Sequence, residues 1–372
     1  MHTTIQNRLN RLKMSLTREN LDAVVVLVEE NRRYLSNFTG EDTQFDESAG
    51  ALIITLNDLI LATDSRYVLQ AKRESPQYDI VTYKEGLAKA LPPILKRLDL
   101  KKLGFESIRM SYKQHGEILK ELTKAALDVK LVPTENLVED LRIIKANPEI
   151  DAIKAALAIA ESVFSDCLPL IQPGVTEKQL AWTMEKQLHE AGADSLSFPT
   201  IVAAGPNSAL PHAIPGSRKI NAGEPVLFDW GVKLNGYCSD ISRTVVIGKP
   251  DETFKKVFQT VLDAQRLAIE AVKPGVSSKA VDEIARNYIN AKGFKGKFGH
   301  GLGHGTGLAI HESPRLSPIR DTPLEPGMVS TIEPGIYLPD WGGVRLENMI
   351  VVRDGSAEIL NQLDPANYRI EI

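Results

Sequence analysis

An internal repeat in the second part of this chain constrains its fold more strongly than any other feature, and its period is about 101 to 104 residues. Each copy opens with Pro-Gly-Val, at residues 173–175 and at residues 274–276. The helix predicted after each motif closes at a glycine, Gly192 or Gly293, and the distance from the glycine of the motif is the same in both copies. The matched spacing predicts two related structural halves.

The repeat continues beyond these helices. Gly223 leads into an apolar run that ends six residues later in Asp229, and Gly327 leads in the same way to Glu333. Solenoid proteins use shorter units and need at least three of them, so a solenoid is excluded. We therefore expect one domain made of two related halves, with a functional site where the halves meet.

The first part of the chain alternates short β-branched runs with helical stretches, which is typical of an α/β domain, and we expect a mixed sheet there. Buried strands are predicted over 23–28, 51–55, 59–62 and 103–105, and helices over 87–98 and 111–127. A long alanine-rich helix follows, over about 149–171. The predicted fold class is α+β, with an α/β domain at residues 1–137 and the duplicated domain at residues 138–372.

Composition narrows the class of protein. The formal net charge of -4 gives no reason to expect a nucleic-acid partner. Every apolar run is shorter than a membrane-spanning helix requires, and residues 1–13 are polar, so neither a membrane span nor a secretory signal is predicted. Cys167 and Cys238 are the only cysteines, which indicates a reducing compartment. We expect a cytoplasmic protein.

Two acids in each half occupy matching places. Asp229 ends an apolar run and is followed by Asp240, while Glu333 ends another and is followed at a similar distance by Glu347. Such pairs fit two neighbouring antiparallel strands that each offer one inward carboxylate. A single acid of this kind could simply begin a turn, since Trp-Gly or Pro-Gly follows two of them. Four acids at matching places indicate a shared site.

Histidines cluster in one glycine-rich segment of the second half. His300, His304 and His311 all lie in this segment, with four glycines between them, and His212 lies in the first half. Glycines let a backbone approach a ligand closely and adopt positive φ angles. The segment lacks the Gly-Lys-Ser/Thr ending of a phosphate-binding loop, which argues against that alternative.

Four carboxylates and one imidazole suit two divalent ions held close together and bridged by carboxylates. A structural zinc site would prefer four Cys or His ligands, which this chain does not offer. The carboxylate-rich set favours Mn²⁺, Co²⁺, Fe²⁺ or Zn²⁺, and the sequence does not choose among them. A paired metal site lowers the pKa of a shared water, so the predicted chemistry is hydrolysis.

The order Asp, Asp, His, Glu, Glu, with its flanking sequences, resembles the metallopeptidase family of methionine aminopeptidase, prolidase, aminopeptidase P and creatinase. The resemblance covers the whole second part and implies the duplicated pita-bread fold, two divalent metal ions with Mn²⁺ foremost, and a homodimer. The first part resembles the creatinase/prolidase N-terminal domain. The residues that match the five metal ligands of the family are Asp229, Asp240, His304, Glu333 and Glu347.

Further matches imply the proline-specific branch of the family. His212 follows Leu210 and Pro211, precedes Asp229 and matches an active-site histidine of that branch. His311 matches a second one, placed to donate a proton or to hold the substrate carbonyl, and His300 matches a histidine that lines the cleft. Arg345 matches an arginine that supports the site, and Glu333 could accept the proton of the attacking water.

The resemblance therefore implies an Xaa-Pro aminopeptidase of the aminopeptidase P type that acts on proline-containing peptides. Prolidase, which cleaves Xaa-Pro dipeptides, is the alternative, because it would use the same residues. A metal-free binding protein would have broken ligands, and a different metallohydrolase would cut peptides without proline. One departure is small: Asn348 stands after Glu347, where an acid is common in relatives.

Overall fold

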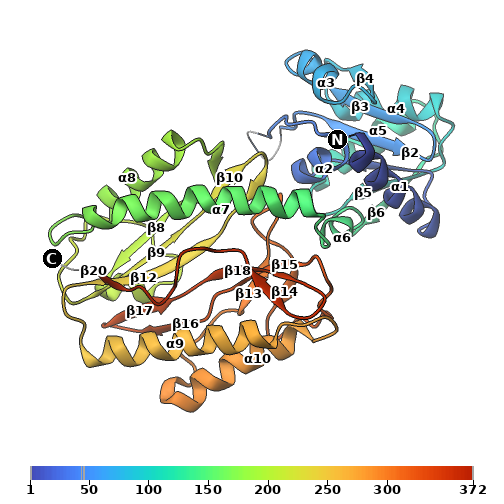
Figure 1. Ribbon diagram of the computed structural model, residues 1–372. Helices are drawn as coiled ribbons and strands as arrows, with labels where there is room; N and C mark the ends of the chain where they lie inside the picture. Colours follow the sequence, from blue (N-terminus) through green and yellow to red (C-terminus); the bar gives the residue numbers. More distant parts are fainter. Residues whose placement is uncertain (1, 43, 45–46, 371–372) are drawn as a thin grey trace. The chain divides into compact units, whose positions relative to one another are not determined.

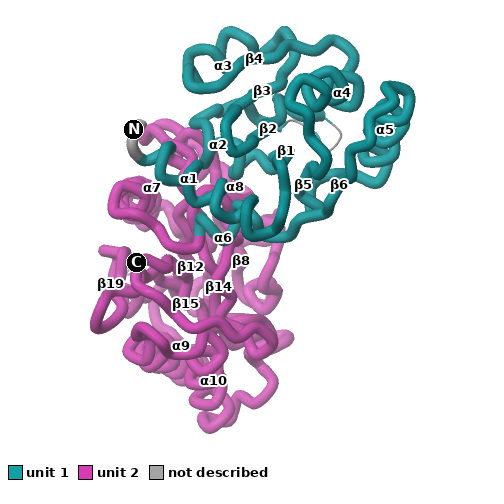
Figure 2. Tube along the Cα trace, turned by 90° about the vertical axis from the view of Figure 1, so that its right-hand side faces the viewer, with its two compact units in different colours: residues 1–142 teal, residues 143–372 magenta. Residues whose placement is uncertain are grey.

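The computed structural model describes residues 2–42, 44 and 47–370. The chain divides into two compact units, residues 1–142 and residues 143–372 (Figure 2). We call them unit 1 and unit 2. The sequence predicts a boundary after residue 137, and the structure divides the chain after residue 142, within the segment that leads to the long helix.

Unit 1 is an α/β unit built on one six-stranded sheet. Its strands are β1 (Ala23–Val26), β2 (Ala51–Thr55), β3 (Leu59–Thr63), β4 (Asp79–Thr82), β5 (Lys102–Glu106) and β6 (Lys130–Thr134). Its helices are α1 (His2–Arg18), α2 (Glu29–Ser36), α3 (Val68–Glu74), α4 (Leu87–Arg97), α5 (Tyr112–Lys124) and α6 (Glu139–Arg142). The sheet order is β4-β3-β2-β1-β5-β6, and the expected mixed sheet is confirmed, since β1 pairs antiparallel with β2 and parallel with β5.

The strands predicted in unit 1 are the buried ones. β1 and β2 are buried at every position, so their continuous apolar runs are visible in the sequence. β4 and β6 were not predicted. They lie at the two edges of the sheet, half-buried or exposed, and they lack the continuous apolar runs of β1 and β2, although β4 contains the β-branched residues Ile80, Val81 and Thr82. The predicted helix over 87–98 forms as α4 with Pro92 and Pro93 inside it.

Unit 2 contains four long helices and fourteen strands among its described residues. The helices are α7 (Asn147–Cys167), α8 (Glu177–Glu190), α9 (Glu252–Ala271) and α10 (Ser278–Ile289). The strands are β7 (Ser195–Leu196), β8 (Ile201–Ala204), β9 (Pro225–Trp230), β10 (Val232–Leu234), β11 (Tyr237–Cys238), β12 (Ile241–Ile247), β13 (Gly303–Gly305), β14 (Glu312–Leu316), β15 (Val329–Ile332), β16 (Gly335–Leu338), β17 (Gly342–Arg345), β18 (Asn348–Val352), β19 (Ala357–Ile359) and β20 (Arg369–Ile370).

The backbone confirms the duplication. The repeat glycines adopt matched positive φ angles in the two halves, which are 93° and 82° at Gly174 and Gly275, 99° and 93° at Gly192 and Gly293, and 83° and 90° at Gly223 and Gly327. A side chain at such an angle would be strained, so glycine is required there. Each copy of the last glycine also donates its amide to the end of a strand, to Ile247 in one half and to Val352 in the other.

The two halves meet where their central sheets approach each other. One sheet has the order β20-β12-β9-β8, and the other has the order β14-β13-β15-β18-β19. The amide of Glu347, just before β18, donates to the carbonyl of Ser242 on β12 at 3.1 Å. Helices α7 and α8 flank one half, and α9 and α10 flank the other (Figure 1). Across the described residues, the helices include none with the length and apolarity of a membrane span.

Candidate metal centre and active site

The predicted ligands lie at the ends of the central strands of unit 2. Asp229 is on β9, Asp240 directly precedes β12, Glu333 directly follows β15 and Glu347 directly precedes β18. The antiparallel pairings β9–β12 and β15–β18 therefore bring one pair of acids together in each half. His304 is on β13, which pairs with β15.

A compact group forms from three of these residues. Asp240, His304 and Glu347 each offer a ligand atom, and these atoms lie within 4.8 Å of one another. Glu333 adjoins the group, with its Oε1 at 3.5 Å from Nε2 of His304, and Oδ2 of Asp240 lies 3.4 Å from the same nitrogen. Asp229 acts on the group through its charge, since it raises the pKa of Asp240, Glu333 and Glu347.

The carboxylates of the group repel one another in a buried place. Burial, followed by the charges of neighbouring carboxylates, raises the pKa of Asp240 and of Glu347 well above the usual range. Burial raises the pKa of Glu333 to about 8. Burial also lowers the pKa of His304 to about 3, so its imidazole is neutral, as a metal ligand must be.

Two carboxylate oxygens of the predicted ligands have no hydrogen-bond partner in the described part of the chain. Oδ1 of Asp229 and Oε1 of Glu347 are buried without a hydrogen bond. A buried polar atom without a partner is costly, and a buried unpaired charge is more so. A divalent cation would satisfy both oxygens and neutralise the repulsion. The residues therefore fit metal ions of the hard or borderline kind.

These pKa shifts predict how the stability of the metal-free protein depends on pH. Glu333 has an ordinary pKa of 4.5 and a folded-state pKa of about 8, so between these values the folded protein keeps a proton that the unfolded chain releases. Stability then falls as pH rises through this window. His304, with an ordinary pKa of 6.5 and a folded-state pKa of about 3, has the opposite effect below pH 6.5, so we expect the Tm in excess chelator to decrease from pH 6.5 to pH 8. A Tm that rises over this range would contradict the repulsion.

Arg345 connects Asp229 to three other elements. Its Nη2 donates to Oδ2 of Asp229 at 2.6 Å, and its Nε donates to Oγ of Ser242 at 2.8 Å. Its Nη1 donates to the hydroxyl of Tyr337 at 2.9 Å and to the carbonyl of Pro211 at 3.2 Å. The guanidinium is thus the charge partner of Asp229 and an anchor for the segment that carries His212.

His300 is held by the protein at both ring nitrogens. The carbonyl of Gly301 can only accept, so Nδ1 of His300 carries the ring proton, and Nε2 accepts from the hydroxyl of Tyr337, 2.9 Å away. Nδ1 of His300 then donates to the carbonyl of Gly301 at 2.8 Å. Burial lowers the pKa of His300 to about 4, in agreement with this neutral tautomer. The geometry argues for a positioning role, whereas the sequence predicts substrate contact.

His311 and His212 lie on more open segments. The ring of His311 packs edge-on against His304, with centroids 4.4 Å apart, and its side chain is exposed. Burial, then Arg315 and His212, lower the pKa of His311. His212 contributes to the lowered pKa of His300 as well as to that of His311, so it lies near both rings.

Sequence reasoning missed several residues of this site. Ser242 donates to Oε2 of Glu347 at 2.9 Å, and Thr331 donates to Oε1 of Glu333 at 3.1 Å. Tyr337 connects Arg345 to His300. A signal existed for Thr331, which lies two residues before Glu333. Ser242 lies equally close to Asp240, but its partners Glu347 and Arg345 are more than 100 positions away, so its contacts could not be predicted.

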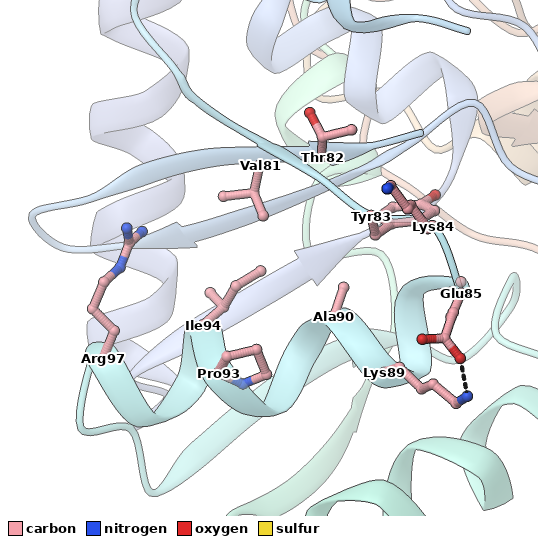
Figure 3. A pocket seen from close by; sticks show the side chains of 11 residues that line it. Val81, Thr82, Tyr83, Lys84, Glu85, Lys89, Ala90, Pro93, Ile94 and Arg97 are labelled. Carbon is pink, nitrogen blue, oxygen red and sulfur yellow. Dashed lines mark hydrogen bonds and ion pairs between the residues drawn. The ribbon is translucent and has the colours of Figure 1, made fainter. Parts of the chain in front are cut away.

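An open pocket of about 440 Å³ lies in unit 1, between the segment of β4 and helix α4 (Figure 3). Val81, Ala90 and Ile94 give it an apolar lining, while Lys84 and Arg97 stand at its rim. It contains none of the residues predicted for the site. Among the described residues, the group of acids and histidine that could hold a metal ion belongs to unit 2.

Comparison with known proteins gives consistent matches over both units. A model of metallopeptidase family M24 matches residues 151–354, and a model of the creatinase/prolidase N-terminal domain matches residues 8–144. A Pyrococcus horikoshii protein named Xaa-Pro dipeptidase is 35% identical over 350 residues, which cover 94% of this chain and 95% of that protein.

Solved structures resemble the whole chain. An Xaa-Pro dipeptidase from Bacillus anthracis shares 37% identity with a TM-score of 0.91, over 98% of this chain and 99% of that one. An X-Pro aminopeptidase from Thermotoga maritima shares 34% identity with a TM-score of 0.86, over 96% of this chain and 100% of that one. The creatinase-type N-terminal unit and the duplicated pita-bread unit expected from the sequence are therefore confirmed.

Proposed function

This chain belongs to metallopeptidase family M24, and on that premise we propose that it hydrolyses the peptide bond that precedes a proline. The observation that supports the proposal most directly is the meeting of Asp240, His304 and Glu347, with Glu333 beside them, at the junction of the two halves. The names of three relatives, all proline-specific peptidases, support the choice of substrate.

Each residue of the site has a proposed role. Two divalent ions, with Mn²⁺ foremost, would be held by Asp229, Asp240, His304, Glu333 and Glu347. Bound ions of this kind lower the pKa of a water and polarise a carbonyl. Glu333 would accept the proton of the attacking water and release it again after the bond is cleaved.

The remaining residues act on the substrate. His311, whose ring lies against His304, would protonate the departing proline nitrogen or hold the carbonyl oxygen. His212 would face the substrate beside it. Arg345 would hold Asp229 in place through their 2.6 Å contact.

The sequence predicts action on peptides longer than two residues, in the manner of aminopeptidase P. A dipeptidase is the second candidate, and the names of the Pyrococcus horikoshii and Bacillus anthracis relatives favour it. Both candidates use the same residues in unit 2. The cytoplasmic location and the homodimer expected from the sequence stay predictions.

A paired peptide assay tests this proposal. We expect the Mn²⁺-loaded protein to release the first residue from Xaa-Pro or Xaa-Pro-Xaa peptides, and Asp229→Ala to abolish the release. Cleavage of the dipeptide alone identifies a dipeptidase, and cleavage of the longer peptide identifies an aminopeptidase. Equal cleavage of peptides with alanine in place of proline, or no cleavage at all, would overturn the proposal.

A further inference from the structure

The segment that carries His311 is tied to the rest of unit 2 by a buried ion pair. Nζ of Lys145 lies 2.9 Å from Oε2 of Glu312, the residue that follows His311. The two side chains are only 2% and 8% exposed. Lys145 lies 167 positions away in the chain, just before α7, so this contact exists only in the folded protein.

Glu312 uses its second carboxylate oxygen within its own segment. Oε1 accepts the amide of Ala309 at 2.9 Å, so one carboxylate joins the turn before His311 to Lys145. Two further contacts restrict the same turn. The hydroxyl of Thr306 donates to the carbonyl of Ile310 at 3.1 Å, and the carbonyl of Gly307 accepts the amide of Cys238 at 2.8 Å.

The packing around Lys145 leaves little room for another arrangement. A Cβ added at Gly307 would lie 2.8 Å from Oε2 of Glu312 and 3.0 Å from Cε of Lys145. On the other side, the amide of Lys145 donates to the carbonyl of Gly327 at 2.9 Å. A Cβ at Gly327 would lie 2.8 Å from Ile144. A side chain at Gly307 would displace the ion pair, and Gly327 also has a φ of 90°, which favours glycine.

The geometry points to Lys145 as a positioning residue for His311, acting through Glu312. This inference rests on the proposed function, in which His311 touches the substrate. A catalytic imidazole that is displaced by about 1 Å can cost on the order of 100-fold in rate. The ion pair would hold the backbone of residues 309–312, and with it the ring of His311 against His304.

The test must remove the pair without leaving a buried charge alone, because an unpaired buried charge is itself strongly destabilising. The double variant Lys145→Met/Glu312→Gln removes both charges at nearly constant size. The side-chain carbonyl of the glutamine can still accept the amide of Ala309. Lys154→Met is the matched control, since Lys154 forms a more exposed ion pair with Glu358 in the same unit.

We expect the double variant to lower kcat by about 10- to 100-fold and to change KM by less than about twofold. The same double change is then made in a His311→Ala background. If the pair acts through His311, it costs less than about twofold there, because coupled residues are not additive. An equal loss in both backgrounds, or no loss in the first, would overturn the inference.

Amide hydrogen exchange supplies a second readout that does not depend on activity. Peptides covering residues 306–312 should exchange faster in the double variant than in the unaltered protein. In Lys154→Met their exchange rate should be unchanged. Unchanged exchange at 306–312 in the double variant would also refute the positioning role. If the unaltered protein cleaves no Xaa-Pro bond, the proposed function fails, and the exchange experiment still decides whether the pair holds this segment.

Discussion

Glu347→Gln should stabilise the metal-free protein while it abolishes metal-dependent activity. Glu347 is buried, and Glu333 and Asp229 add repulsion to the burial that raises its pKa. Gln has nearly the same shape and no charge, and its carbonyl can accept the hydrogen bond from Ser242. In the metal-free protein the Glu347 carboxyl must either carry a buried charge or take up a proton, and its replacement should raise the free energy of unfolding by about 1–3 kcal/mol at pH 7.

In the metal-loaded protein, Glu347→Gln should lower stability rather than raise it, because a proposed metal ligand is lost. Loss of a residue that only orients a ligand typically costs about 10- to 100-fold in metal affinity or activity, so loss of a ligand itself should cost more than about 100-fold. The rise in Tm on addition of Mn²⁺ should therefore shrink.

Thermal unfolding with Mn²⁺ and with chelator, together with the peptide assay, measures both effects of Glu347→Gln. Glu358→Gln is the control, because Glu358 pairs with Lys154 and Arg353 at the surface and has no contact with the site. A metal-free Glu347→Gln protein that is less stable than the parent would contradict the account of repulsion. An undiminished response to Mn²⁺ would remove Glu347 from the proposed ligands.

Arg345→Met should destabilise the folded protein by about 3–5 kcal/mol, which is the usual result of removing one partner of a buried ion pair. Arg345 is 3% exposed and donates to four acceptors on different segments. Its loss would leave Asp229 uncompensated among other carboxylates. Metal binding should restore part of the lost stability, because the ions also neutralise the charge of Asp229.

Urea unfolding of the metal-free protein measures the loss caused by Arg345→Met. Arg353→Met is the matched control, because Arg353 forms a half-exposed ion pair with Glu358 and should cost less than about 1 kcal/mol. Equal effects of the two substitutions would show that Arg345 is not the main compensating charge of the site.

Local sequence patterns were sufficient for the buried elements. The strand predicted over residues 51–55 forms with the same bounds as β2, because every position in it is buried and apolar residues dominate it. β4 and β6 were missed because they are short edge strands, half-buried or exposed, without the continuous apolar run that marks a buried strand. Each pairs on one side only, β4 with β3 and β6 with β5.

The residues of the site also fall into those that local sequence could predict and those that it could not. The four acids and the histidine-rich segment could be found because the repeat placed them at equivalent strand ends, within short stretches of chain. The contacts of Tyr337, Ser242 and Lys145 could not be found in this way. Their partners lie between 8 and 167 positions away, so even Ser242, two residues after Asp240, could not be matched to its partners from the sequence.

The sequence by itself determined the duplication, the order of the acids and the positions where only glycine can adopt the backbone angle, because these are properties of short segments. The tertiary structure alone decided that Glu347 and Asp229 each keep an oxygen that no described residue hydrogen-bonds. It also decided that Tyr337 and Gly301 bind both ring nitrogens of His300 and that Lys145 pairs with Glu312. These contacts depend on how buried side chains from distant segments pack, and the free energy of that packing is set by the whole fold.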